Sequence, residues 1–219
     1  MHSGLVTVNG HKMAKSAGNV IGLSQVLDRQ PNPDVLKLLF AMTHYRSPLD
    51  FTWEKLDDAA KACQRFITLA DTVDQLTTQR HRQQGAESRQ PVPPALTPAM
   101  TAVQAQFDQA LADDVNTPEA IAALFELVRL GHSAFEAGAL EAATAIVADI
   151  QQRGVLLGLF AQRGSRRLTV DPKVQELMDK RTAARQAKDF ATADRLRREI
   201  QQHGYVVEDT AGGTICRPT

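Results

Sequence analysis

Apolar residues that recur every three or four positions are the feature that most constrains this chain of 219 residues. One such stripe runs over residues 56–70, a second over 100–111, and two more follow Pro118 and Leu140. This spacing places the apolar side chains on one face of an α-helix. Asn116-Thr117-Pro118, with proline in the first turn, also favours a helix start. The sequence therefore predicts a mainly α fold built around a helical bundle.

Two stretches interrupt this helical pattern. Residues 80–98 contain four prolines, and residues 162–172 contain Gly164 and the pair Arg166-Arg167. Proline lacks a backbone N–H and clashes with the preceding turn, so the first stretch is predicted to break any helix. The resulting map has six parts, with the limits 1–25, 26–79 (helical), 80–98 (flexible linker), 99–161 (helical bundle), 162–172 (second linker) and 173–219.

The two ends of the chain show strand and turn patterns instead. Residues 5–8 (LVTV) precede Asn9-Gly10, a pair that supplies the positive φ angles of a tight hairpin. At the other end, Asp189 can cap a helix that Gly204 closes. Residues 205–209 and 214–217 then flank a turn. We therefore expect a hairpin before the bundle and a small α+β unit after it.

Charge and composition narrow the class of protein. The 25 basic and 25 acidic side chains cancel, but residues 99–160 carry a net −6, whereas 1–98 carry +2 and 161–219 carry +4. An anionic partner would be attracted to the two ends. No run of 18 apolar residues is present, and Cys63 and Cys216 stand in unrelated contexts. We expect a monomeric, cytoplasmic protein with no membrane segment, no disulfide framework and no metal site in this chain.

The most specific motif is residues 11–19 (HKMAKSAGN). Its two lysines lie three positions apart after a hairpin, so they can bring two ammonium groups to one polyphosphate. An isolated Lys-x-x-Lys is more often an ordinary solvated loop. Here the whole stretch resembles the Lys-Met-Ser-Lys-Ser signature of class I aminoacyl-tRNA synthetases, including the Gly-Asn that commonly follows it. It departs from that signature at Ala14, where the family usually has serine.

Further motifs resemble the cysteinyl-tRNA synthetase family in the same order. They are MHSG at 1–4, HYRSPL at 44–49, ADDVNTPEA at 112–120, KDFATAD at 188–194, VEDT at 207–210 and GT at 213–214. The resemblance implies that the chain is the C-terminal portion of such an enzyme. The Rossmann catalytic half of the family and its cysteine pocket would then lie upstream of Met1. A truncated gene, a misplaced start and a deliberate fragment all fit this pattern.

The resemblance assigns roles to residues 11–19, here called the lysine loop. ATP is the substrate of the family, and Lys15 would be the catalytic residue that contacts its phosphates. Lys12, Met13 and Ser16 would also bind ATP. Ala14 removes a hydroxyl that could hold the loop, although one neutral hydrogen bond contributes only about 1 kcal/mol. The full-length family also holds zinc, but its ligands (two Cys, a His and a Glu) are absent from this chain.

The resemblance also implies that the partner is the tRNA for cysteine. Arg185, Asp194 and Asp209 fall where the family presents side chains to the anticodon, and charged forks and carboxylates suit exposed base edges. Without the resemblance, a salt-bridged surface helix would explain them better. Cys216 stands where the family commonly has tryptophan, whose ring could stack on a base.

Two further motifs each keep two interpretations. Arg46 either contacts tRNA or braces a junction between a helix and a loop. The carboxylates of Asp113 and Asp114, before a proline-started helix, are more often a cap than an acid–base pair.

The sequence thus favours the C-terminal part of a cysteine–tRNA ligase. In this map 1–25 ends the catalytic domain with the signature loop, 26–79 faces tRNA and 173–219 binds the anticodon. Alone, the chain is expected to bind tRNA without activating cysteine, so its own status as an enzyme stays open. The alternatives are a non-catalytic tRNA-binding paralogue and the cysteine ligase of mycothiol biosynthesis, which needs no anticodon-binding unit.

Overall fold

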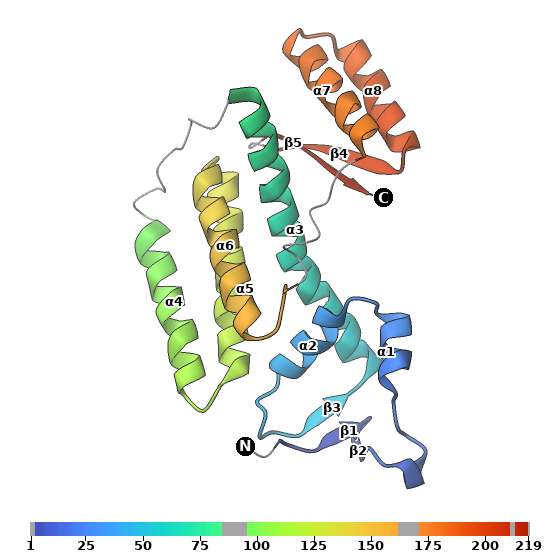
Figure 1. Cartoon of the computed structure of the whole chain (residues 1–219), viewed down its shortest axis with the longest axis vertical. Helices are drawn as coiled ribbons and strands as arrows, with labels where there is room; N and C mark the ends of the chain where they lie inside the picture. The colour runs from blue at the N-terminus through green and yellow to red at the C-terminus, as the bar shows by residue number, and fades with distance from the viewer. Residues whose placement is uncertain (1–2, 85–95, 162–170, 211–212, 219) are drawn as a thin grey trace.

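The computed structural model describes residues 3–84, 96–161, 171–210 and 213–218 (Figure 1). Over these ranges the chain is mainly helical, as predicted, and its units lie along one long helix, α3 (Trp53–Gln84). Several predicted features lie outside the described residues. They are residues 1–2 of the MHSG motif, the central parts of both predicted linkers (85–95 and 162–170, with Arg166 and Arg167) and residues 211–212 of the predicted C-terminal turn.

The first unit is built on a three-stranded sheet. β1 (Val6–Val8) pairs antiparallel with β2 (His11–Lys12) and parallel with β3 (Leu49–Phe51), so the strand order is β2-β1-β3. The predicted hairpin is confirmed, because Asn9 and Gly10 adopt φ angles of 51° and 78° in the turn between β1 and β2.

Two short helices precede β3, and α3 follows this strand directly. They are α1 (Leu23–Arg29) and α2 (Pro33–Ala41), and both lie in the connection between β2 and β3. The Thr52 hydroxyl accepts a hydrogen bond from the Lys55 backbone N–H at 3.2 Å, which satisfies a donor at the start of α3. The 32 residues of α3 span about 48 Å at 1.5 Å per residue. One helix therefore reaches from the sheet to the far end of the molecule.

The first predicted linker is wrong at both of its limits. α3 continues through Gln84, and α4 (Leu96–Ala112) begins before Pro98. Pro98 does not break α4 because it lies in the first turn, where backbone N–H groups have no partner within the helix. Helix is therefore present at both ends of the interval 80–98.

The bundle consists of α4, α5 (Thr117–Glu136) and α6 (Leu140–Leu156) packed beside α3. Its core is continuous with residues of α2 and α3, and Leu124 and Ile146 have no exposed surface. The predicted start of α5 is confirmed, because Asn116 Oδ1 accepts from the Glu119 backbone N–H at 3.3 Å.

The C-terminal unit is the predicted small α+β structure. It contains α7 (Pro172–Gln186), α8 (Phe190–Gln202) and a hairpin of β4 (Tyr205–Thr210) and β5 (Gly213–Pro218). Asp189 caps α8 by accepting from the Thr192 backbone N–H at 3.0 Å, as predicted. This unit has its own apolar core, formed by Val174, Leu177, Met178, Leu196, Ile200, Val207 and Cys216.

Cys216 belongs to that core and offers no surface for a base. Its side chain is 1% exposed, and burial raises the pKa of its thiol to about 11. The thiol therefore acts as a small apolar group in this chain.

The C-terminal hairpin is attached directly to α3. The Gln75 side chain donates to the Cys216 carbonyl (2.6 Å) and accepts from the Cys216 backbone N–H (2.8 Å). Gln79 donates to the Thr214 carbonyl at 2.7 Å, and Ile215 packs into the core of the bundle. Figure 1 shows the hairpin lying across the end of α3. The two amide side chains satisfy the backbone of β5 as a neighbouring strand would.

Replacement of Gln75 by Glu tests this attachment. The carboxylate can still accept from the Cys216 N–H, but it cannot donate to the Cys216 carbonyl. An unsatisfied partly buried acceptor costs about 1–3 kcal/mol, so we expect this loss in the free energy of unfolding, with faster hydrogen exchange at the Cys216 amide.

The matched control is Gln64→Glu on the same helix, where the side chain is exposed and contacts only Thr68 at 3.3 Å among the interactions described. Equal stability of the two variants, with unchanged exchange at Cys216, would show that Gln75 does not hold the hairpin.

Candidate functional site

The lysine loop includes β2 and a short 3-10 turn, η1 (Lys15–Ala17). Lys12 ends β2 and Lys15 begins η1, and both lysines are exposed. Met13 is half-buried, and its backbone N–H donates to the Val6 carbonyl at 3.3 Å. Ser16 is exposed. The structure thus brings the two lysines to one accessible loop; their role toward ATP stays a prediction.

Asn19 closes this loop. Its Oδ1 accepts from the Ala14 backbone N–H at 2.9 Å, and its Nδ2 donates to the Lys12 carbonyl at 3.0 Å. One amide therefore ties both sides of the turn that carries the lysines. The loop is held through the backbone of Ala14, so its closure does not require the hydroxyl that serine would supply at this position.

Asp50 fixes the hairpin that precedes the loop. This β3 carboxylate accepts from the Gly10 backbone N–H at 2.7 Å and from the Thr7 hydroxyl at 2.8 Å. These bonds, with that of Gly10 as the largest cause, lower the pKa of Asp50. Sequence reasoning missed Asp50, and the only local signal is a carboxylate between the two buried residues of a short strand, Leu49 and Phe51.

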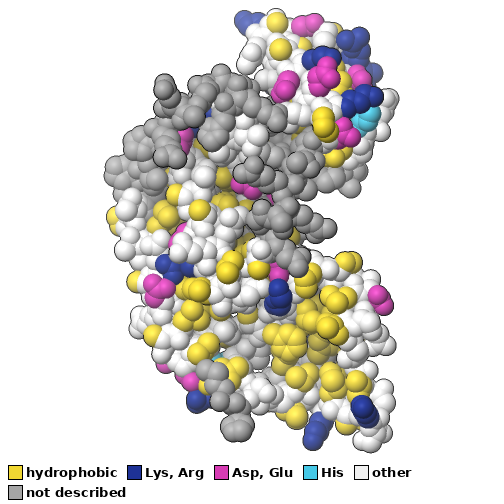
Figure 2. Space-filling view, viewed as in Figure 1, with side chains coloured by type: hydrophobic (Ala, Val, Ile, Leu, Met, Phe, Trp, Pro, Cys, Tyr) yellow, Lys and Arg dark blue, Asp and Glu magenta, His cyan; other side chains and the backbone are white. Residues whose placement is uncertain are grey.

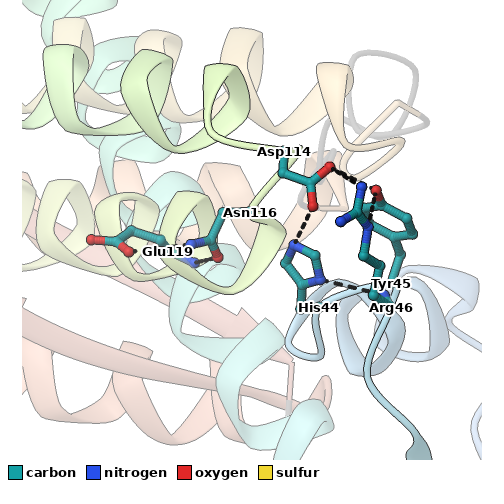
Figure 3. Close-up of polar contacts among 6 residues, drawn as sticks. All are labelled: His44, Tyr45, Arg46, Asp114, Asn116 and Glu119. Carbon is teal, nitrogen blue, oxygen red and sulfur yellow. Dashed lines mark hydrogen bonds and ion pairs between the residues drawn. The ribbon is translucent and has the colours of Figure 1, made fainter. Parts of the chain in front are cut away.

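A second cluster joins the turn after α2 to the turn between α4 and α5 (Figure 3). Asp114 Oδ1 accepts from the Tyr45 hydroxyl at 2.7 Å and from Arg46 Nη2 at 2.9 Å. Arg46 Nε also donates to the Tyr45 oxygen at 2.8 Å, and His44 Nε2 lies 3.8 Å from Asp114 Oδ2. Asp114 and Val115 adopt positive φ angles of 52° and 54°. Such an angle is unusual for Val115, because its side chain is β-branched.

This cluster changes the interpretation of the carboxylate pair. Asn116 caps α5, so the prediction that the carboxylate pair caps this helix is wrong for both Asp113 and Asp114. Asp113 is exposed. The Tyr45 hydroxyl and the Asp114 charge raise the pKa of Arg46, whose side chain is still 65% exposed. Arg46 therefore braces a junction, as one of its two interpretations held, while its contact with tRNA stays a prediction.

A third cluster surrounds Asp209 on β4. Arg181 of α7 donates two hydrogen bonds to this carboxylate, at 3.0 and 2.7 Å, and the Thr214 hydroxyl donates at 2.9 Å. Arg185, one helical turn after Arg181, also forms an ion pair with Asp209. These partners, Arg181 first, hold the pKa of Asp209 well below its usual range.

The structure brings together two of the three predicted anticodon residues. Arg185 and Asp209 are in contact, whereas Asp194 is exposed on α8 and lies outside the described contacts of this cluster. Sequence reasoning missed Arg181, which is only 4% exposed. Its signal was an arginine four positions before Arg185, since such residues share one helix face.

The described residues do not fit a zinc site. Cys63 is buried in the core of the bundle and Cys216 in that of the C-terminal unit, so the two thiols face different interiors. No group of three or more His, Cys, Asp or Glu residues within the described ranges is arranged to hold a metal ion. We therefore derive no chemistry from zinc in this chain. None of the helices in the described ranges is long and apolar enough to cross a membrane.

Three family models match separate parts of the chain. Residues 1–61 match the class I (C) tRNA synthetase catalytic domain, residues 106–161 the DALR domain, and residues 169–217 the cysteinyl-tRNA ligase anticodon binding domain. The loop, the bundle and the unit around Asp209 thus correspond to parts of a class I aminoacyl-tRNA synthetase.

Curated relatives give the family within that class. The chain is 36% identical to the cysteine–tRNA ligase of Halorhodospira halophila, with 100% of the chain and 44% of the relative covered. It is 37% identical to the cysteine–tRNA ligase of Micrococcus luteus, with 99% of the chain and 44% of the relative covered. It is 34% identical to that of Aquifex aeolicus, with 98% of the chain and 47% of the relative covered. The chain belongs to the cysteine–tRNA ligase family and spans a little under half the length of these relatives, as their C-terminal portion.

The depressed pKa of Asp209 predicts how the C-terminal unit responds to acid. A carboxylate whose pKa is lower in the folded state stabilises that state above the ordinary aspartate pKa of about 3.9. This contribution is lost as the pH falls toward the folded-state pKa. Asp209→Asn should therefore lower stability at pH 7, and its difference from wild type should shrink below about pH 4.

Chemical denaturation of both proteins between pH 7 and pH 3 measures this difference. Asp179→Asn is the control, because it removes an exposed carboxylate from the same helix as Arg181. A difference between wild type and Asp209→Asn that stays constant over the whole pH range would contradict the prediction.

Proposed function

We propose that this chain supplies the ATP-phosphate-binding loop and the tRNA-binding and anticodon-binding units for ATP-dependent attachment of cysteine to its tRNA. The observation that carries the proposal is the pair Arg185–Asp209, which lies at an accessible position of the unit that matches an anticodon-binding model. Both side chains are about two-fifths exposed, at 43% and 38%. A fork of N–H donors beside a carboxylate offers donors and acceptors to an unpaired base.

The lysine loop supports the first part of this proposal. Formation of an acyl-adenylate displaces pyrophosphate from ATP, so negative charge must be stabilised on the departing phosphates. Lys12 and Lys15 present two exposed ammonium groups on a turn that Asn19 closes and Asp50 anchors. In this role Lys15 contacts the phosphates, and Lys12, Met13 and Ser16 complete the contact.

The distribution of charge supports the second part. Figure 2 shows Lys and Arg side chains gathered, together with acidic ones, on the C-terminal unit. Residues 161–219 carry 12 basic and eight acidic side chains. Long-range attraction of a tRNA phosphate backbone needs such a positive region, whereas the choice of base needs defined contacts. In this proposal Arg46 adds an exposed guanidinium near the bundle, and Asp194 a carboxylate on α8.

The domain map is part of the proposal. The tRNA would contact the helical segment 26–79 and the unit 173–219, whose hairpin is attached to α3 within that segment. The match at 169–217 favours this function over the mycothiol-type cysteine ligase, which has no need to read an anticodon. The chain would act as a monomer toward one tRNA.

Arg185→Ala tests the reading of the anticodon. Loss of a bidentate base contact should weaken binding of an RNA hairpin that carries the cysteine anticodon GCA by about 1–3 kcal/mol. Binding of a hairpin with a different anticodon should change much less. Fluorescence anisotropy at two salt concentrations measures both affinities.

Arg197→Ala on the exposed face of α8 is the charge-matched control. Since a phosphate contact carries no base information, this variant should weaken both hairpins equally and mainly at low salt. Equal losses for the two anticodons in Arg185→Ala would mean that Arg185 is a backbone contact or a surface brace.

A further inference from the structure

Arg181 is a buried charge with an unusual set of partners. Its side chain is 4% exposed, and its two terminal nitrogens donate to the two oxygens of Asp209 at 3.0 and 2.7 Å. This is a two-point fork between a guanidinium and a carboxylate, the strongest common geometry for such a pair. The remaining donor, Nε, is buried without a hydrogen-bond partner. Burying an arginine is unfavourable unless its charge is paired, so the burial of Arg181 depends on its contact with Asp209.

Asp209 therefore has two arginines in different environments. Arg181 approaches from the interior of the C-terminal unit, while Arg185, in the last turn of α7, has a side chain that is 43% exposed. Thr214, opposite Asp209 on β5, adds a neutral donor. A carboxylate needs only one neighbouring cation to remain neutralised. Arg185 is thus the partner that can leave.

The departure of Arg185 would be costly without Arg181. If Arg185 were the only cation beside Asp209, turning toward an external acceptor would leave that carboxylate uncompensated. With Arg181 in place, Asp209 keeps a two-point partner and its orientation. The exposed guanidinium can then exchange an internal acceptor for an external one of similar chemistry, such as the edge of an unpaired base.

We propose that Arg181 is a positioning residue that keeps Asp209 neutralised and oriented, so that Arg185 is free to bind a nucleobase edge. The proposal deepens the proposed anticodon reading and rests on it. Without Arg181, Arg185 is the only arginine among the described contacts of Asp209. The uncompensated carboxylate should then keep Arg185 paired with it. The preference for the matched anticodon should then fall by about tenfold, which is the range of one bidentate base contact.

The experiment compares three variants of the full chain. Arg181→Gln removes the charge and the fork, Arg181→Lys keeps the charge but loses the fork, and Lys180→Gln removes one charge from the neighbouring exposed position. Each is titrated with matched and mismatched anticodon hairpins. We expect the ratio of the two affinities to fall in Arg181→Gln, to fall less in Arg181→Lys and to stay unchanged in Lys180→Gln.

Two further measurements separate positioning from general loss of structure. In an Arg185→Ala background, Arg181→Gln should change the affinity ratio no further. In the free protein, the NMR signal of the Arg185 Nε–Hε group should shift and exchange more slowly with water in Arg181→Gln and Arg181→Lys than in wild type. If thermal melts show that Arg181→Gln does not fold, Arg181→Lys provides both readouts.

The outcomes are distinguishable. An unchanged affinity ratio in folded Arg181 variants, when wild type discriminates, overturns the positioning role alone. Equal binding of both hairpins by wild type overturns the proposed anticodon reading instead. In that case the NMR signal of Arg185 still decides whether Arg181 governs its freedom, and an unchanged signal would overturn this inference as well.

Discussion

The pairing of the Gln75 side chain with the backbone of Cys216 is the contact on which the arrangement of the molecule depends. A side-chain amide has one donor side and one acceptor side, so it can satisfy a strand edge as another peptide group would. Gln79 repeats the donor half of this contact at Thr214. Because both residues lie on α3, the helix that starts beside the sheet also holds the C-terminal hairpin.

A single helix therefore connects the two proposed sites. At its beginning, α3 follows strand β3, whose Asp50 anchors the hairpin of the lysine loop. Near its end, the attached hairpin carries Asp209 and thereby the pair of arginines from α7. Between them, Asp114 links the turn after α2 to the bundle. Long-range contacts of this kind let a mainly helical chain present two distant sites in a fixed relation.

Features that depend on local sequence could be predicted. The Asn9-Gly10 turn requires positive φ angles at adjacent positions, and Asn116 and Asp189 each cap a helix through a bond to the residue three positions on. The stripe over 56–70 identified α3 because helical periodicity is itself local. The limits near Pro98 failed since a proline in the first turn and one inside a helix look alike in sequence.

Features that depend on tertiary contact could not be predicted. Tyr45 and Asp114 are 69 positions apart, and Gln75 and Cys216 are 141 positions apart. The sequence around one residue of each pair therefore does not indicate the other. Motif resemblance identified Arg185 and Asp209, yet it gave no reason to expect that the buried Arg181 of α7 pairs with Asp209 of β4. Such residues act through the geometry of another side chain, which only the folded structure brings into view.

The distance between the N-terminal unit and the C-terminal unit, which α3 connects, tests the central claim most directly. Spin labels at Ser24→Cys and His203→Cys, both exposed positions, would report this distance by pulsed electron paramagnetic resonance, since Cys63 and Cys216 are buried. A fixed attachment of the C-terminal unit predicts one narrow distance distribution in the protein without RNA, which broadens in Gln75→Glu. A broad distribution in the wild-type protein would contradict the account.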